Sequence, residues 1–393
     1  MSRKYKIIIA IALALLLGVG IYIGCRRNSG RRVSEQTDLI LWYIEGDEFH
    51  DAFADIAEEY GQLNSSENVS LEARGFISFE AIEKALKSVK SDDAPDMIAC
   101  DVNEAALLYE SGRTKKCSEY ITEWATEELN EDLVACASLD NGLVAVPYAA
   151  NIEMMIANTE KISDADSIYS IEKLCRLSKK YYNENGSAMF TISDYAAFFK
   201  TAMAQLGESF DAVSPRYSDS KNCKKIYDLL AETAFDRGLC VSEEPVSDVV
   251  TGKIPCAIVS STQIMSSADK ITDKVGIYPC PFIKGGEQVY SLEAEGICFC
   301  KTDENSRIAA EEFVKWFLSK EINRGFIADS GYCPAVGDMS ALASDRPVFE
   351  KLKAVIYELS TFSEHADFPA NADYAKNYGE FINAMQSVMD SLS

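Results

Sequence analysis

Short apolar runs alternate with amphipathic stretches along the chain beyond residue 38. Residues 39–44 (LILWYI) are continuously apolar and rich in β-formers, which predicts a buried strand. The apolar positions that follow recur every three or four residues, as they do on one face of a helix. These positions are Phe49, Phe53, Ile56 and Tyr60. The folded part of the chain is therefore predicted to begin with a strand and a helix.

The same alternation continues through residue 103. Residues 69–76 predict a second strand, and residues 79–89 carry the apolar face of a second helix. Residues 95–101 (PDMIACD) predict a third strand, after which Asn103 begins a helical stretch. Strands that alternate with helices of this length form parallel βαβ units, so we expect an α/β domain.

Beyond this domain the pattern becomes less regular. Residues 143–148 (LVAVPY) predict a strand that leaves the first domain. Further strands are predicted at 189–192, 254–259 and 275–278, and helices at 171–182, 195–206, 221–234 and 308–318. We interpret the apolar face of the last helix as core packing, because the helix is too short for a coiled coil. That face consists of Tyr374, Tyr378, Phe381, Met385, Val388 and Leu392.

An uncharged apolar run near the N-terminus predicts export. Three basic residues within positions 3–6 precede residues 7–24, which contain no charged residue, and Cys25 follows at once. A basic flank, an apolar core and a small residue before the processing point are typical of an export signal. Residues 21–25 (IYIGC) resemble a bacterial lipobox, although Tyr22 stands where that motif usually has leucine.

Two interpretations of the membrane tether remain open. In the first, the signal is cleaved and Cys25 is lipidated. In the second, residues 7–24 stay in place as an anchor, although 18 residues barely span a hydrocarbon core of about 30 Å. In both, residues 26–37 form a linker, and the rest of the chain is held at the outer face of the bacterial cytoplasmic membrane.

Composition narrows the classes of function. The 393 residues have room for two to three domains of about 150 residues each. The formal net charge of −24 repels polyanions, which argues against a nucleic-acid partner. His50 and His365 are the only histidines, and no zinc-protease, P-loop or nucleophile-elbow motif occurs. We therefore expect no catalysis, no cofactor and no metal.

The 12 cysteines predict packing rather than a zinc or disulfide framework. No C-x-x-C pair occurs, and the closest pair is Cys298 and Cys300, whose side chains a strand would point the same way. Cys100 and Cys256 lie in apolar runs, where cysteine usually acts as a small core residue.

Candidate ligand contacts follow the predicted parallel strands. In an open α/β sheet the ligand binds beyond the carboxyl ends of the strands. The residues at these places are Glu45, Asp47, Phe76, Asp101 and Asn103. The sequence therefore predicts that these five contact a ligand. A purely structural role is the alternative, since Asp47 is also placed to cap the first helix.

Several short motifs occur in an order that resembles one protein family. They are APDMIA at 94–99, LVAVPY at 143–148, IAN at 156–158, VVTGKIPCAI at 249–258, RIAAEEF at 307–313, LSKE at 318–321 and SGYCPA at 330–335. Together with the strand and helix at 39–62, they resemble the bacterial extracellular solute-binding proteins of family 1, the maltose-binding-protein-like components of ABC importers. The resemblance spans about residues 38–393.

The resemblance implies a periplasmic-binding-protein-like α/β fold of type II, with two lobes, hinge strands and a ligand cleft. One lobe would combine residues 38–147 and 296–335, and the other would combine 148–291 and 336–393. Residues 292–295 would form a hinge, with further crossings near 147–148 and 335. Closure about such hinges is a known switching mode.

The resemblance also adds candidate ligand contacts. Those at the crossings are Tyr148, Asn151, Glu295 and Tyr332. Those in the second lobe are Ser193, Asp194, Tyr195, Ser261, Thr262 and Gln263. Ser193 and Asp194 are also placed to cap the helix that follows them, which is the structural alternative.

The function that the resemblance implies is capture of a small solute, most simply a carbohydrate, and its delivery to an ABC permease by a monomeric lipoprotein. A surface receptor that presents its ligand to a sensor kinase is the first alternative, and a carbohydrate-active enzyme is a less favoured one. A polyamine, peptide or other cationic solute is a further alternative, since Glu45, Asp47, Asp101, Asp194 and Glu295 are all acidic. None of the three tryptophans falls at a predicted contact.

Overall fold

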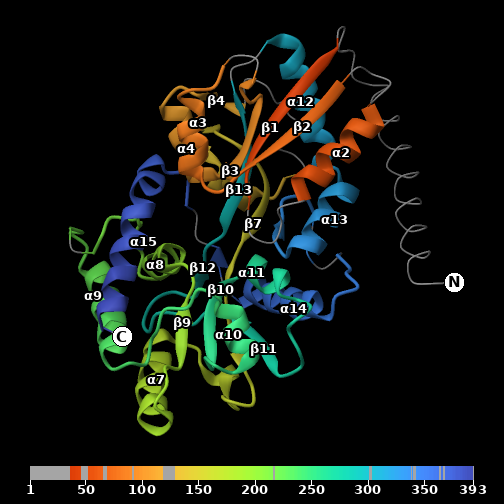
Figure 1. The fold of residues 1–393 in the computed structure, drawn as a ribbon. Helices are drawn as coiled ribbons and strands as arrows, with labels where there is room; N and C mark the ends of the chain where they lie inside the picture. The colour runs from red at the N-terminus through yellow and green to blue at the C-terminus, as the bar shows by residue number, and fades with distance from the viewer. Residues whose placement is uncertain are drawn as a thin grey trace, which may run out of the picture.

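Two bodies, each built on a β-sheet, are joined by long strands (Figure 1). The computed structural model describes residues 36–45, 52–64, 69–90, 93–117, 129–215, 217–300, 303–337, 339, 342–362, 364–365 and 368–392. Cys25, Asp47, His50 and Trp124 lie outside these ranges. We call the body with the larger sheet the first lobe and the other body the second lobe.

The first lobe contains a seven-stranded sheet in the order β14-β7-β13-β3-β1-β2, with β4 paired to β13. Its strands are β1 (Thr37–Ile44), β2 (Val69–Phe76), β3 (Met97–Asp101), β4 (Thr114–Lys115), β7 (Val146–Asn151), β13 (Glu293–Cys300) and β14 (Cys333–Pro334). β1 pairs in parallel with β2 and β3, which confirms the predicted βαβ units. β13 runs antiparallel to both β3 and β7.

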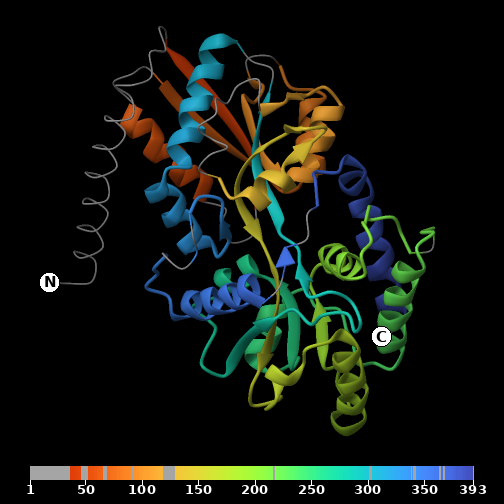
Figure 2. The ribbon, with the colours of Figure 1, turned by 180° about the vertical axis from the view of Figure 1, so that it is seen from behind.

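Helices cover both faces of this sheet. They are α2 (Ala52–Asn64), α3 (Phe79–Leu86), α4 (Val102–Glu110), α6 (Glu131–Cys136), α12 (Glu304–Phe317) and α13 (Lys320–Ser330), with the short hairpin β5 (Ser138–Leu139) and β6 (Gly142–Leu143) beside them. The view from behind in Figure 2 shows α12 lying across one face of the sheet.

The second lobe contains a four-stranded sheet in the order β11-β8-β10-β9. Its strands are β8 (Glu153–Asn158), β9 (Phe190–Ile192), β10 (Cys256–Ser260) and β11 (Val275–Pro279). The surrounding helices are η4 (Ala165–Ser167), α7 (Ile171–Asn185), α8 (Tyr195–Gln205), α9 (Lys221–Phe235), α10 (Pro245–Thr251), α11 (Ser261–Ser266), α14 (Pro347–Phe362) and α15 (Ala372–Leu392). β12 (Val289–Tyr290) pairs with β15 (Glu364–His365).

The chain passes between the two sheets at short segments. β7 belongs to the first sheet and ends at Asn151, and β8 begins in the second sheet at Glu153. The chain returns between β12 and β13, where Ser291 and Leu292 are buried. The exact residue limits of the two lobes remain the prediction made from the sequence.

The C-terminal segment contacts both lobes. On the first-lobe side, the Ala370 N–H donates to the Ser138 carbonyl (3.1 Å) and Lys376 forms an ion pair with Glu110 of α4 (3.2 Å). On the second-lobe side, the Asn377 amide donates to the Asp211 carbonyl (2.9 Å). Figure 1 shows α15, in dark blue, running from α4 down to α9.

The face of α15 differs in part from the prediction. Phe381 and Met385 are buried as expected, and Met389 completes the buried stripe instead of Val388. Tyr378 is 37% exposed, so its predicted place in the core is wrong. Its ring lies beside that of Tyr374 (6.0 Å), and its hydroxyl donates to the Asp194 carboxylate (2.9 Å), so the side chain makes a polar contact rather than filling the core.

The cysteines pack as small core residues. All eleven cysteines of the described part of the chain are free thiols, and all but the half-buried Cys240 are buried. Cys298 and Cys300 lie on β13, as their spacing predicts. No helix among the described residues is both long enough and apolar enough to cross a membrane.

Aromatic rings fill the middle of the first lobe. The Phe317 ring lies 5.8 Å from Phe53, 5.6 Å from Tyr148 and 5.5 Å from Phe326, measured between ring centroids. Phe317 itself is fully buried. Tyr148 therefore packs its ring into the core that supports the sheet.

We expect Phe317→Ala to lower the free energy of unfolding by about 3–5 kcal/mol, because it leaves a cavity among four rings. Urea denaturation of the exported body measures this change. Phe235→Ala is the matched control, since the Phe235 side chain on α9 is 69% exposed and its loss should cost about 0.5 kcal/mol or less. Equal losses in the two variants would contradict this account of the core.

Candidate functional site

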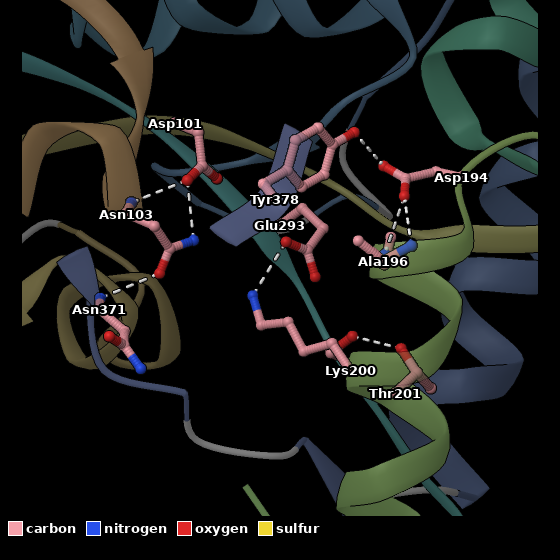
Figure 3. Close-up of polar contacts among 11 residues, drawn as sticks. Asp101, Asn103, Asp194, Ala196, Lys200, Thr201, Glu293, Asn371 and Tyr378 are labelled. Carbon is pink, nitrogen blue, oxygen red and sulfur yellow. Dashed lines mark hydrogen bonds and ion pairs between the residues drawn. The ribbon is translucent and has the colours of Figure 1, made fainter. Parts of the chain in front are cut away.

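Asp101 ends β3 and begins α4. Its Oδ1 accepts the Asn103 N–H (2.8 Å), and the Glu104 carboxylate accepts the Asp101 N–H (3.2 Å), so the two residues form a capping box. The Asn103 side-chain amide also donates to Asp101 (2.7 Å), and its oxygen accepts the N–H of Asn371 (3.0 Å). These contacts hold Asp101 at the carboxyl end of a parallel strand, as predicted, and tie it to the C-terminal segment (Figure 3).

β13 brings two more carboxyl groups to this place. Glu295 is the register partner of Asp101 across the antiparallel pair of β13 and β3. Glu293 lies two residues earlier and forms an ion pair with Lys200 of α8, with 2.9 Å between Nζ and Oε2. The Lys200 side chain is buried and that of Glu293 is 16% exposed. The Lys200 ammonium also lies over the rings of Phe368 (5.2 Å) and Tyr374 (5.3 Å).

Asp194 supplies a carboxyl group from the second lobe. It caps α8 by accepting the N–H groups of Ala196 (2.7 Å) and Ala197 (3.0 Å). Its other oxygen accepts the Tyr378 hydroxyl of α15. Figure 3 shows the Tyr378 side chain directed at Asp194, with Glu293 and Lys200 nearby.

Glu153 is a buried carboxyl group at the start of β8. It is 7% exposed, and its Oε2 has no hydrogen-bond partner among the described residues. It borders a very small internal cavity together with Thr201 and Ser291, whose hydroxyls hydrogen-bond to each other. We use the name interlobe carboxyl cluster for Asp101, Glu153, Asp194, Glu293 and Glu295.

Burial raises the pKa of four of these five carboxyl groups. Burial, together with the charges of Asp101 and Glu293, raises the pKa of Glu295 to about 8. Burial raises the pKa of Asp101 to about 6, although Lys200 opposes the change. Burial also raises the pKa of Asp194 and, well above its ordinary value, that of Glu153.

The pKa of Lys200 is raised as well, which favours its charged form. Burial alone would lower the pKa of its ammonium, but the carboxylates of Glu293 and Asp101 outweigh that effect and raise it. Lys200 therefore stays charged at neutral pH. Among the described residues it is the only cation in an ion pair with a member of the cluster.

A cavity of about 560 Å³ opens beside the ion pair. Asn103 and Leu139 line it from the first lobe, Lys200 and Phe210 from the second, and Tyr374 from α15. A volume of this size lies within the range of small-molecule sites. Lys200 connects this cavity to the interlobe carboxyl cluster, whose five carboxyl groups do not line it.

The other predicted contacts from the first lobe pack against their neighbours. Glu45 is half-buried and lies over Gly75 of the adjacent strand. The Phe76 ring contacts Trp42, with 4.7 Å between centroids. Tyr332 stacks on Phe326 (5.8 Å).

The remaining predicted contacts lie in the second lobe or at its junction with the first. The Asn151 oxygen accepts from the Ser261 hydroxyl and the Thr262 N–H (3.4 Å each). Gln263 accepts the N–H of Ser260 in a capping box. Ser193 donates its N–H to the Ile258 carbonyl. Tyr195 is buried in the core of the second lobe.

Sequence reasoning missed Glu153, Lys200, Glu293, Tyr374 and Tyr378 as members of the site. Lys200 carried a usable signal, because it is the one charged residue in the apolar helix YAAFFKTAMAQ. Glu293 and Glu295 also stand on one face of a strand that is otherwise apolar or small. The two tyrosines had no signal of their own, because their spacing matches a core face.

We expect Glu295→Gln to flatten the dependence of stability on pH. Glu295 shifts from an ordinary value of 4.5 to about 8, so between these pH values the folded chain holds a proton that the unfolded chain releases. Stability is therefore lost as pH rises through this window, by about 1.4 kcal/mol per pH unit for one proton. Asp101 and Glu293 bias this titration, and Glu104 also interacts with Glu295.

Melting temperatures between pH 5 and 9 test this prediction. The wild type should lose stability as pH rises, and Glu295→Gln should lose less. Glu358→Gln on the exposed side of α14 is the control and should follow the wild type. Identical pH profiles for wild type and Glu295→Gln would contradict the proposed protonation of the cluster.

Comparisons with known proteins agree with the fold. A family model described as a bacterial extracellular solute-binding protein matches residues 55–354. The GacH receptor of Streptomyces glaucescens, solved unliganded and with acarbose, superposes with a TM-score of 0.71 at 14% identity over 92% of this chain and 95% of that one. The substrate-binding protein Lmo0181 of Listeria monocytogenes, in complex with cycloalternan, gives 0.70 at 13% over 91% and 95%. Maltose-bound MalE3 of T. maritima gives 0.68 at 12% over 91% and 98%.

Proposed function

The chain belongs to the bacterial extracellular solute-binding proteins, and on that premise we propose that it captures a carbohydrate between its two lobes and delivers it to an ABC permease. The observation that carries the proposal is the interlobe carboxyl cluster. Its members come from the first lobe (Asp101), the second lobe (Glu153 and Asp194) and the connecting strand β13 (Glu293 and Glu295). A ligand held by all three parts favours the closed arrangement of the lobes, because its contacts are complete only there.

The chemistry of these groups suits a polyhydroxylated ligand. Carboxylate and amide oxygens accept hydrogen bonds from hydroxyl groups, and protonated carboxyls and amides donate to them. The rings of Tyr374 and Tyr378 lie 6.0 Å apart and provide apolar faces beside the polar groups. The three solved structures named above were determined with saccharides or a saccharide analogue, which supports the same class of ligand.

We assign direct contact with the solute to eight members of the predicted set, five of which are acidic. These are Glu45, Asp47, Asp101, Asn103, Asn151, Ser193, Asp194 and Glu295. We assign a supporting role to residues whose side chains pack against the sheets or cap helices, which are Phe76, Tyr148, Tyr195, Ser261, Thr262, Gln263 and Tyr332. We expect binding without turnover and a monomeric receptor.

Asp101→Asn should abolish or sharply reduce stabilisation by the bound sugar. A ligand at a hundredfold excess over its Kd stabilises the folded state by about 2.7 kcal/mol, which a thermal-shift screen of mono- and oligosaccharides detects. Asparagine caps a helix about as well as aspartate, so the variant should fold normally. Any loss of the shift then reports on the solute.

Asp303→Asn is the matched control for this experiment. Asp303 also caps a helix, α12, by accepting the N–H groups of Asn305 and Ser306, but it is not a member of the interlobe carboxyl cluster. Asp303→Asn should keep the full sugar-induced shift. A screen in which no carbohydrate raises the melting temperature of the wild type would refute the proposed function.

We further propose that the full chain is exported and tethered through a lipid on Cys25. Cys25→Ser should then release the protein from the membrane fraction and abolish metabolic labelling with an alkyne fatty acid. Wild-type protein that remains in the membrane without labelling would favour the uncleaved anchor instead.

A further inference from the structure

We propose that the cleft prefers a carbohydrate that carries a protonated amino group over the neutral sugar of the same shape. The inference rests on the proposed function and concerns the chemical class of the ligand. It is drawn from the balance of charges and of hydrogen-bond donors in the interlobe carboxyl cluster.

The first argument is that carboxyl groups outnumber basic groups in the cluster. Five carboxyl side chains from β3, β8, β13 and the start of α8 face a single paired cation, Lys200, in the described part of the chain. Asp101 and Glu293 act on Glu295, and Asp194 and Glu293 act on Glu153, so these groups are close enough to repel one another. A ligand ammonium favours the ionised form of these carboxyl groups and pairs with it, whereas a neutral sugar does not.

The second argument is that two carboxyl oxygens of the cluster have no hydrogen-bond donor. Glu153 is more than nine-tenths buried and its Oε2 lacks a partner, and Glu293 Oε1 likewise lacks one among the described residues. An ammonium group offers three donors and no acceptor, which matches a cluster of acceptors. A hydroxyl group offers one donor and brings two acceptor lone pairs that the cluster does not need.

The third argument is that the cluster already holds one ammonium. Lys200 Nζ is held by the Glu293 carboxylate and lies over the rings of Phe368 and Tyr374. Tyr378 repeats part of this environment on the more open side, because its ring is 37% exposed and its hydroxyl binds the Asp194 carboxylate. A second ammonium, brought by the ligand, would meet the same combination of carboxylate and aromatic face.

A matched series of sugars tests the inference. Glucose, glucosamine and N-acetylglucosamine differ only at one substituent, and the galactose and mannose series repeat the comparison in two other configurations. Dimers and trimers of glucosamine and N-acetylglucosamine extend it to longer ligands. Isothermal titration calorimetry at pH 6.5 should show at least tenfold tighter binding of an amino sugar than of its neutral and N-acetylated counterparts.

Variants of two cluster residues test whether the cluster causes the preference for amino sugars. Glu295→Gln and Glu153→Gln replace carboxyl groups that a bound ammonium would ionise with amides that stay neutral, at little change in size, and each should reduce the ratio of amino-sugar to neutral-sugar affinity severalfold. Glu184→Gln makes the same substitution on the exposed surface of α7, where Glu184 pairs with Lys180, and should leave the ratio unchanged. Two variants are used so that a folding defect in one does not decide the result.

The outcomes separate the inference from the function on which it rests. Neutral sugars that bind as tightly as their amino counterparts would overturn the inference and leave the proposed function standing. A preference that survives both cluster variants would overturn its assignment to this cluster. Failure of every sugar in the series and of the wider carbohydrate screen to bind would overturn the proposed function and the inference together.

Discussion

The candidate site depends on the antiparallel pairing of β13 with β3 and β7. This pairing sets Glu295 opposite Asp101 and places Glu293 where the chain returns from the second lobe. Because β3 is itself parallel to β1, the carboxyl end of the first βαβ unit and the connecting strand meet at one point. A one-residue slip of β13 would turn both glutamates to the other face of the sheet.

The interlobe carboxyl cluster lowers the free energy of unfolding, and the surrounding core compensates for this loss. Buried carboxyl groups that repel one another keep protons and oppose the stability of the closed form at higher pH. The ion pair of Lys200 with Glu293 removes only part of this repulsion. The aromatic core around Phe317 and the contacts of α15 with both lobes hold the arrangement together.

The sequence predicted the strands and helices of the first lobe better than the contacts between the two lobes. The spacing of apolar residues along the chain predicts the parallel strands β1, β2 and β3. The rule that ligands bind at the carboxyl ends of strands in an open sheet predicts the position of Asp101. Lys200, Glu153 and Tyr378 could not be assigned in this way, because their partners are distant in the chain. Lys200 and Glu293 are 93 residues apart, and Tyr378 and Asp194 are 184 residues apart. The spacing of Tyr378 matches the core face of its helix, and only the structure shows its contact with Asp194.

The most direct test of the account is a crystal structure of the protein with the sugar that gives the largest thermal shift. The account predicts a sugar between the lobes, with polar atoms within hydrogen-bond distance of Asp101 from the first lobe, Asp194 from the second, and at least one carboxyl group of β13. A sugar bound to the outer surface of one lobe, with the interlobe carboxyl cluster unchanged, would contradict it.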